Sequence, residues 1–286
     1  DGVMKTFSMR PADTERFEEV QCAVCGARES RTRYSLPDAR FVGCRQCGHV
    51  YQSPRPVFDD LRNRYQDNYF DYEIENEQAF FRLMLQGLND ISFQHLEDSL
   101  NGARRFLDVG CATGMLLEHM KDRGWNVQGV EICEPAARYG IDHRGVAIKV
   151  ATLEESTLTA GSFDVVHLSH LIEHVPDPRL FLEEAARVTK PGGYLVLVTP
   201  DLSGFQARLF GRRWRSAIAD HLHLFSYRII RTLLADAGFE VVKKRSWGGL
   251  AAGMGPSRLK GFADKWAKRL NVGDVMIVLA RRLDRG

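Results

Sequence analysis

The feature that most constrains the fold is a short apolar segment that runs into a glycine turn, Phe106-Leu-Asp-Val-Gly-Cys-Ala-Thr-Gly114. Its first half is typical of a buried strand, and the helical pattern that follows the turn begins at Thr113. A second short strand ends in Glu131, 23 residues after Asp108. Strand, turn, helix and strand in this order predict a βαβ unit that binds a nucleoside at the carboxyl end of its strands.

The residues of the turn decide which nucleoside is expected. In a dinucleotide fingerprint, G-x-G-x-x-G, three glycines let the backbone approach a pyrophosphate and pack the helix tightly. Here the third position is Ala112 and the sixth is Met115, so that pattern fails. A ligand with a ribose and a charged amino-acid tail, but no phosphate, needs only the turn and Gly114. Glu131 is placed to accept hydrogen bonds from both ribose hydroxyls. The ligand that fits is S-adenosylmethionine.

Four segments together resemble the successive motifs of a class I S-adenosylmethionine-dependent methyltransferase: FLDVGCATGMLLEHM, GVEICEPAARYG, GSFDVVHLSHLIEHVPDP and RVTKPGGYLVLVTPD. They occur in the order of that family and at its usual spacing, and they cover about residues 104 to 286. The resemblance implies an enzyme that transfers a methyl group. The motifs resemble ubiquinone-type O-methyltransferases in the core. They also resemble zinc-containing sugar C-methyltransferases, which share an N-terminal cysteine ribbon but usually carry a further C-terminal domain.

From residue 103 onward the apolar pattern alternates between strands and helices. Strands are expected near residues 104–109, 125–131, 145–150, 163–168 and 194–199, with a final pair at 239–246 and 274–280. Helical patterns between the first five argue for a parallel sheet with right-handed crossovers. The fold class predicted is therefore α/β, and the resemblance implies a Rossmann-like methyltransferase sheet whose last strand is antiparallel.

Four of the six cysteines form two Cys-x-x-Cys-Gly knuckles. Cys22 and Cys25 are separated from Cys44 and Cys47 by 18 residues, which is typical of a four-thiolate zinc site and not of a disulfide framework. A redox role explains one such pair but not two matched ones. Four thiolates leave no coordination position for a reacting water, so the expected zinc is structural.

The chain is expected to divide into three regions. Residues 17–54 form the zinc-ribbon module, residues 55–102 a linker with lid helices, and residues 103–286 the methyltransferase domain, with substrate-pocket inserts at about 201–226 and 247–272. Apolar residues at helical spacing predict an amphipathic helix near residues 80–91 that packs on the sheet. In the enzymes that this chain resembles, this region also covers the cofactor. The lid candidates are Tyr65, Tyr69, Phe70 and Tyr72.

The residues expected to hold the cofactor follow the carboxyl ends of the strands. They are Asp108, Gly110, Cys111 and Gly114 at the methionine tail, Glu131 at the ribose, Ile132 against the adenine face, Thr152 and Leu153 at the adenine rim, and Ser169 and His170 near the sulfonium. The contacts at Thr152 and Leu153 are expected to come from the backbone. Asp108 is expected to receive the ammonium of the tail, to tie down the turn, or to do both.

Methyl transfer from a sulfonium is an in-line displacement, so the protein mainly aligns the acceptor and removes its proton where needed. Histidine is the natural base near neutral pH. The candidates, in order of preference, are His223, His221 and His174. His221 and His223 are two residues apart, on one face of an extended segment that follows the fifth strand. The pair could instead bind a metal with Asp220, and each histidine could serve only to orient substrate.

Composition leaves several functions open. A net charge of +2 indicates no general affinity for nucleic acid or membranes, and no apolar run approaches the ~20 residues that cross a bilayer. No secretory signal precedes the first region, so a cytoplasmic protein is expected. The expected acceptor is a small molecule, methylated on oxygen or carbon: a specialised metabolite, a quinone precursor or a sugar. The alternatives are an RNA methyltransferase that uses the zinc ribbon and basic patches, and a non-catalytic methyltransferase-like scaffold. The oligomeric state is not indicated.

Overall fold

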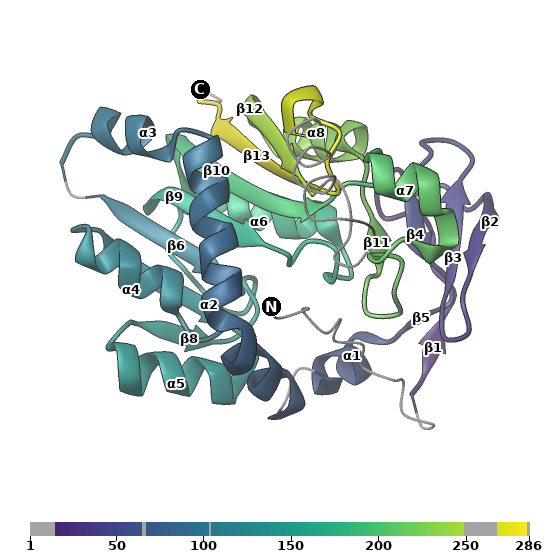
Figure 1. Ribbon diagram of the computed structural model, residues 1–286, viewed down its shortest axis with the longest axis horizontal. Coiled ribbons are helices and arrows are strands. Elements are labelled where there is room, and N and C mark those ends of the chain that lie inside the picture. The colour runs from purple at the N-terminus through teal and green to yellow at the C-terminus, as the bar shows by residue number, and fades with distance from the viewer. Residues whose placement is uncertain (1–14, 65–66, 103, 249–267, 285–286) are drawn as a thin grey trace, which may run out of the picture.

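The computed structural model describes residues 15–64, 67–102, 104–248 and 268–284. An α/β unit and a small β ribbon lie side by side in it (Figure 1). The lid candidate Tyr65 and most of the insert expected at 247–272 lie outside the described residues.

A seven-stranded sheet forms the centre of the α/β unit, with strand order β12-β13-β10-β9-β6-β7-β8. The strands are β6 (Arg105–Val109), β7 (Asn126–Glu131), β8 (Ile148–Val150), β9 (Phe163–Ser169), β10 (Thr189–Pro200), β12 (Phe239–Trp247) and β13 (Val275–Arg282). The pairs among β8, β7, β6, β9 and β10 are parallel, whereas β13 runs antiparallel to both β10 and β12. The predicted Rossmann-like sheet with an antiparallel last strand is confirmed.

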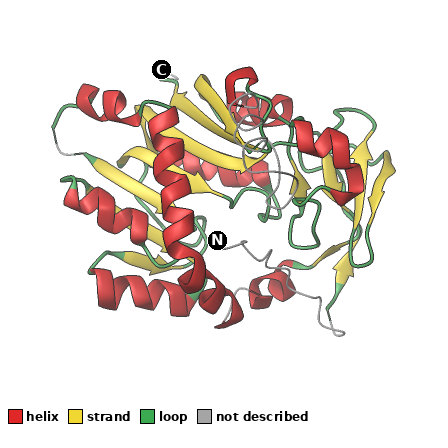
Figure 2. Cartoon of the chain, in the orientation of Figure 1, coloured by secondary structure: helices red, strands yellow, loops and turns green. Residues whose placement is uncertain are grey.

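Helices cover both faces of this sheet, as Figures 1 and 2 show. One face carries α2 (Asp67–Asp90), α4 (Met115–Asp122) and α5 (Glu134–Arg144), and the other carries α6 (Pro178–Val188) and α8 (Tyr227–Asp236). Because both faces are covered, the central strands are apolar along nearly their whole length, and Phe106, Leu107, Val165 and Val166 are all fully buried.

The helix expected near residues 80–91 begins much earlier, at Asp67. Its first half is rich in acidic and amide residues, so the apolar periodicity alone marked only the second half. The short helices α1 (Phe58–Arg64) and α3 (Phe93–Ser99) flank it. Within the described ranges, no helix combines the length and the apolar character needed to cross a bilayer.

The ribbon contains a hairpin, formed by β2 (Ser30–Ser35) and β3 (Arg40–Cys44), with β4 (Val50–Gln52) paired to β3. The short strands β1 (Phe17–Glu18) and β5 (Arg55–Pro56) pair beside it. The fourth strand of the ribbon sheet comes from far along the chain: β11 (His223–Leu224) pairs with β4. This pairing was not predicted.

The ribbon and the α/β unit also share side-chain packing. Cys22, Val42 and Tyr51 belong to the same buried apolar cluster as Leu182 and Phe225. Two arginines of the α/β unit reach the knuckles: Arg179 Nη1 donates to the Val24 carbonyl oxygen at 3.0 Å, and Arg228 Nη2 donates to the Cys47 carbonyl oxygen at 2.5 Å. The ribbon is therefore packed into the fold and not tethered beside it.

Candidate active site

The glycine turn after β6 leaves no room for side chains at its end. Gly114 has φ of 75°, which favours glycine, and a Cβ added there would lie 2.9 Å from Val146 Cγ2. A Cβ at Gly140 would lie 2.8 Å from the Thr113 carbonyl oxygen. These glycines let α5 pack against the turn.

Glu131, at the end of β7, is hydrogen-bonded to the same turn. Its Oε2 accepts from the Ala112 backbone N–H at 2.9 Å, and its Oε1 accepts from the Cys133 backbone N–H at 2.8 Å. Burial raises the pKa of Glu131, and the bonds from Cys133 and Ala112 act in the opposite direction. Each carboxylate oxygen has a second lone pair, so the residue could fix the turn and still accept from a ligand hydroxyl.

Asp108 has a partner on the neighbouring strand. His167 Nδ1 donates to Asp108 Oδ1 at 2.7 Å, and both side chains are buried. His167 Nε2 is buried without a hydrogen-bond partner among the described residues. The structure thus brings Asp108 to the turn, where it is anchored by a histidine that sequence reasoning had not singled out as its partner.

The other expected cofactor residues lie along the same edge but differ in exposure. Cys111 and Leu153 are buried, as Asp108 and Glu131 are. Ile132, Thr152, Ser169 and His170 are more accessible, and these four lie directly after β7, after β8, at the end of β9 and just beyond it. His170 has φ of 51°, in the left-handed region that residues other than glycine seldom adopt.

Helix α2 approaches the turn through two acidic residues that the sequence analysis missed. Glu77 Oε2 accepts from Thr113 Oγ1 at 3.2 Å and from Arg144 Nη2 at 2.7 Å. Burial, and next the charge of Glu131, raises the pKa of Glu73 to about 7. Glu73 and Glu77 are four residues apart and share a helix face with Phe81, so their spacing held the signal that could have found them.

The lid candidates Tyr69, Phe70 and Tyr72 lie in the first turns of α2. Phe70 contacts Tyr139 of α5, with 5.9 Å between ring centroids, and Tyr72 contacts Phe80 within α2. The first contact joins the start of α2 to α5, whereas the second lies within α2.

A second group of side chains forms what we name the acceptor cluster: Glu173, His174 and His221. Their ligand atoms all lie within 4.8 Å of one another. Thr199 Oγ1 donates to Glu173 Oε2 at 2.9 Å, and His170 Nδ1 donates to Glu173 Oε1 at 3.2 Å. The cluster joins the loop after β9 to a segment 47 residues further along the chain.

The two histidines of the acceptor cluster are oriented by backbone oxygens. His174 Nδ1 lies 2.8 Å from the Asp220 carbonyl oxygen, and His221 Nδ1 lies 2.8 Å from the Ser216 carbonyl oxygen. A carbonyl oxygen can only accept, so in each ring Nδ1 carries the proton and Nε2 is the basic nitrogen. This is the tautomer that a proton acceptor or a metal ligand requires.

Charge is distributed unevenly over the cluster. Burial opposes ionisation of the Glu173 carboxyl. The pKa of Glu173 is nevertheless lowered to about 2, first by the hydrogen bond and charge of His170 and then by the charges of His174 and His221. Burial, and next the charge of His174, lowers the pKa of His221 to about 3. At neutral pH the cluster therefore holds a buried carboxylate and a neutral His221. Such a carboxylate favours a cationic ligand beside it.

The first catalytic candidate, His223, lies apart from the acceptor cluster. Its Nδ1 is 3.0 Å from His49 Nε2, and its Nε2 is 3.1 Å from the Val175 carbonyl oxygen. Burial, and next the charge of Arg55, lowers the pKa of His223 to about 3. Asp220, the third ligand considered for a His221–His223 metal site, instead accepts from Arg64 Nη1 at 3.0 Å.

The cysteine cluster is assembled as the knuckle spacing predicts. The sulfurs of Cys22, Cys25, Cys44 and Cys47 all lie within 4.8 Å of one another. Cys22–Cys47 and Cys25–Cys44 sulfur pairs are 3.5 Å apart. A tetrahedral zinc with bonds of about 2.3 Å requires sulfurs about 3.8 Å apart, so the cluster fits that ion.

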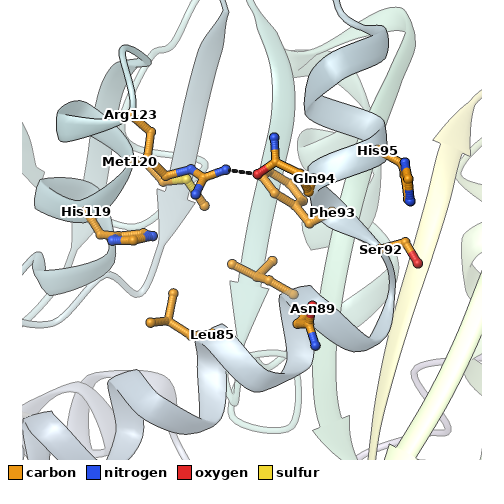
Figure 3. A pocket seen from close by; sticks show the side chains of 10 residues that line it. Leu85, Asn89, Ser92, Phe93, Gln94, His95, His119, Met120 and Arg123 are labelled. Atoms are coloured by element: carbon orange, nitrogen blue, oxygen red, sulfur yellow. Dashed lines mark hydrogen bonds between the residues drawn. The ribbon is translucent and has the colours of Figure 1, made fainter.

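A hollow of about 260 Å³ lies away from these groups, between α2, α3 and α4 (Figure 3). Arg123 crosses it to donate to Gln94 Oε1 and to Glu97. Arg104, just before the start of β6, donates to the Arg123 carbonyl oxygen. The hollow is thus at the amino edge of the sheet, opposite the glycine turn that follows β6.

Sequence comparison matches residues 76–244 to the family model described as a methyltransferase domain. The ubiquinone biosynthesis O-methyltransferase of Bordetella avium is 38% identical over 112 residues, which are 37% of this chain and 46% of that protein. The protein of the same name from Xanthomonas oryzae pv. oryzae is 33% identical over 159 residues, which are 53% of this chain and 62% of that protein. The chain thus spans about half the length of the curated relatives it matches.

Solved structures share the fold at lower identity. A methyltransferase from Thermotoga maritima, described as a possible histamine N-methyltransferase, superposes with a TM-score of 0.54 at 23% identity, covering 75% of this chain and 97% of that one. A methyltransferase from Archaeoglobus fulgidus gives 0.52 at 19% identity, covering 76% of this chain and all of that one. At these identities the likeness concerns the fold alone.

Proposed function

The chain belongs to the S-adenosylmethionine-dependent methyltransferases, and from that premise we propose that it methylates a hydroxyl group of a small aromatic acceptor such as a quinone precursor. The observation that carries this proposal is the acceptor cluster, which gathers a carboxylate and two correctly oriented histidines beside the loop after β9. The names of the curated relatives support an oxygen acceptor.

The cofactor is proposed to lie along the carboxyl edge of β6, β7 and β8. The backbone of the turn at Gly110 and Gly114 and the Asp108 carboxylate would hold the amino-acid tail, while Glu131 accepts from the ribose hydroxyls. Ile132 would contact the adenine, with the backbone at Thr152 and Leu153 along its rim. Ser169 and His170 would face the sulfonium, close to Glu173.

His174 is proposed to take the proton from the acceptor hydroxyl. Its Nε2 is the basic nitrogen, and its ring is only partly buried, so that an acceptor could reach it. The lowered pKa of His221 makes it a weaker base, suited to orienting the acceptor by accepting a hydrogen bond. His223, with both ring nitrogens engaged, is proposed to hold the segment in place.

The same three side chains support a second mechanism. Two imidazole nitrogens and a carboxylate could bind a divalent cation, which would lower the pKa of a bound hydroxyl. The buried, ionised carboxylate of Glu173 also favours the binding of a cation. Under this mechanism His174 and His221 are ligands and neither removes the proton.

The four cysteines are proposed to bind one structural zinc ion. The ribbon they close has its apolar face packed on the core, which favours a structural role. An RNA methyltransferase would need that ribbon as a gripping surface, so we favour the small acceptor.

The proposal is tested by binding and turnover measured separately. Calorimetric titration should give micromolar binding of S-adenosylmethionine and S-adenosylhomocysteine, with no binding of NAD. The protein, incubated with 3,4-dihydroxybenzoate and methyl-labelled cofactor, should transfer label to the ring hydroxyl. His174→Ala should lower turnover at least 100-fold with cofactor affinity unchanged, and His95→Ala, on the exposed side of α3, should leave both unchanged.

A chelator then separates the two mechanisms. Turnover that survives EDTA supports His174 as the base, whereas turnover lost with EDTA and restored by Mg²⁺ or Mn²⁺ supports the cation. Wild-type turnover in His174→Ala would contradict both mechanisms.

A further inference from the structure

We infer that His49, a residue of the cysteine ribbon, is a positioning residue for the acceptor cluster and acts through His223. The inference deepens the proposed function and rests on it, because it concerns the same acceptor pocket. It assigns to the ribbon a part in the reaction that reaches beyond holding a metal.

The hydrogen bond between the rings of His49 and His223 has a defined direction. The Val175 carbonyl oxygen can only accept, so His223 Nε2 carries the proton and His223 Nδ1 is an acceptor. His49 Nε2 must then donate to His223 Nδ1, at 3.0 Å. The bonds run from His49 through His223 to the backbone of Val175, which directly follows His174 in the chain.

The backbone links the ribbon to the acceptor cluster a second time. Gln52 N–H donates to the Leu222 carbonyl oxygen at 2.8 Å, and His223 pairs with Tyr51 across β4 and β11. On the other side of β11, the N–H groups of Leu222 and His223 both donate to the carbonyl oxygen of Glu173, at 2.8 and 3.1 Å. Strand β11 is thus held between the ribbon and the residue that supplies the carboxylate of the cluster.

The environment of His49 explains why its position is well defined. The side chain is 1% exposed and stacks on His223 and Phe225, with ring centroids 5.1 and 5.2 Å apart. Its Nδ1 is buried and has no hydrogen-bond partner among the described residues. An apolar ring at this position would have no unsatisfied buried nitrogen. The presence of a histidine is therefore best explained by the hydrogen bond that its Nε2 donates.

His49 does not itself meet the acceptor. It is fully buried, and its ring contacts Tyr51, Phe225 and His223. It therefore acts on the orientation of the segment that carries His221. Loss of the donated bond should loosen β11 and leave the cofactor turn on the far strands unchanged.

The test compares His49→Leu, which removes the donor, with His49→Gln, whose side-chain amide can replace it. Amide hydrogen exchange at Leu222 and His223 should accelerate at least tenfold in His49→Leu, while exchange in β9 at Val165 and Val166 stays unchanged. His49→Gln should restore most of the protection. Turnover of 3,4-dihydroxybenzoate should fall at least tenfold in His49→Leu, with cofactor affinity within twofold of wild type.

Two results would overturn the inference: unchanged exchange at Leu222 and His223, or equal acceleration in every strand, which would mean a merely structural role. If His49→Leu fails to fold, His49→Gln and His223→Asn decide the question by the same exchange readout. Absence of turnover in the wild-type protein would count against the proposed function alone, because the exchange experiment needs no acceptor.

Discussion

The buried carboxyl of Glu73 in α2 predicts that the stability of the protein depends on pH. Its pKa is raised from 4.5 to about 7, chiefly by burial and then by Glu131. In the unfolded chain this carboxyl has its ordinary pKa. Between pH 4.5 and pH 7 the native state therefore binds the proton of Glu73 more tightly than the unfolded state does. The free energy of unfolding should therefore decrease as pH rises from about 4.5 to 7 and remain lower above that range. Across this pH range the free energy of unfolding should decrease by about 3 kcal/mol.

The substitution Glu73→Gln imitates the protonated carboxyl at every pH. Relative to wild type, the variant should be more stable by about 3 kcal/mol at pH 8 and by less than about 1 kcal/mol at pH 5. Urea denaturation of the cofactor-free protein at both pH values measures this. The exposed Glu75, on the same helix, supplies the control Glu75→Gln, which should change little at either pH.

A positively charged cofactor should reverse the effect. A sulfonium and an ammonium near Glu73 favour the ionised form of its carboxyl, so cofactor binding near pH 7 should release a proton. In calorimetry this release appears as a binding heat that depends on the ionisation enthalpy of the buffer. An equal stability difference between Glu73→Gln and wild type at pH 5 and pH 8 would refute the reasoning, because it would mean that the carboxyl does not titrate in this range.

Three further outcomes are expected. Glu131→Ala should weaken binding of S-adenosylmethionine at least tenfold in calorimetry while the fold survives; unchanged affinity would remove this residue from the ribose. Elemental analysis of freshly purified protein prepared without chelator should give one zinc per chain, and less than half an equivalent would defeat the four-thiolate assignment. Asp177, the N-cap of α6, accepts from the backbone N–H groups of Arg179 and Leu180, so Asp177→Ala should cost about 1 kcal/mol in urea denaturation, whereas Asp177→Ser should cost much less.

Local sequence patterns were sufficient for most of the fold. Strands β6 and β9 were expected within a residue of their observed limits, because buried parallel strands are continuous apolar runs bounded by turns. The turn at Gly114 and the hairpin of β2 and β3 are likewise local, since their residues lie close together in the chain. Such features need no knowledge of which distant segments meet.

The site was less accessible to sequence reasoning. The pattern that placed His221 and His223 on one face of an extended segment could not show that β11 pairs with the ribbon, which directs His223 toward His49. It also could not show that His174 and His221 converge, because that depends on how two loops meet. Glu73 shares a helix face with Glu77 and Phe81, but that spacing alone could not show that α2 brings its carboxyl close to Glu131.

The pairing of β4 with β11 has a consequence for how the chain matures on the ribosome. His49 and His223 are 174 residues apart, which at usual synthesis rates takes roughly 9 to 35 s to translate. During that interval the ribbon has its cysteines but lacks its fourth strand, and the edge of β4 and the apolar surface around Tyr51 are without their final cover. A nascent chain in this state exposes a strand edge and apolar surface to which a chaperone can bind. Truncation before residue 223 should leave a ribbon that can bind metal but tends to aggregate.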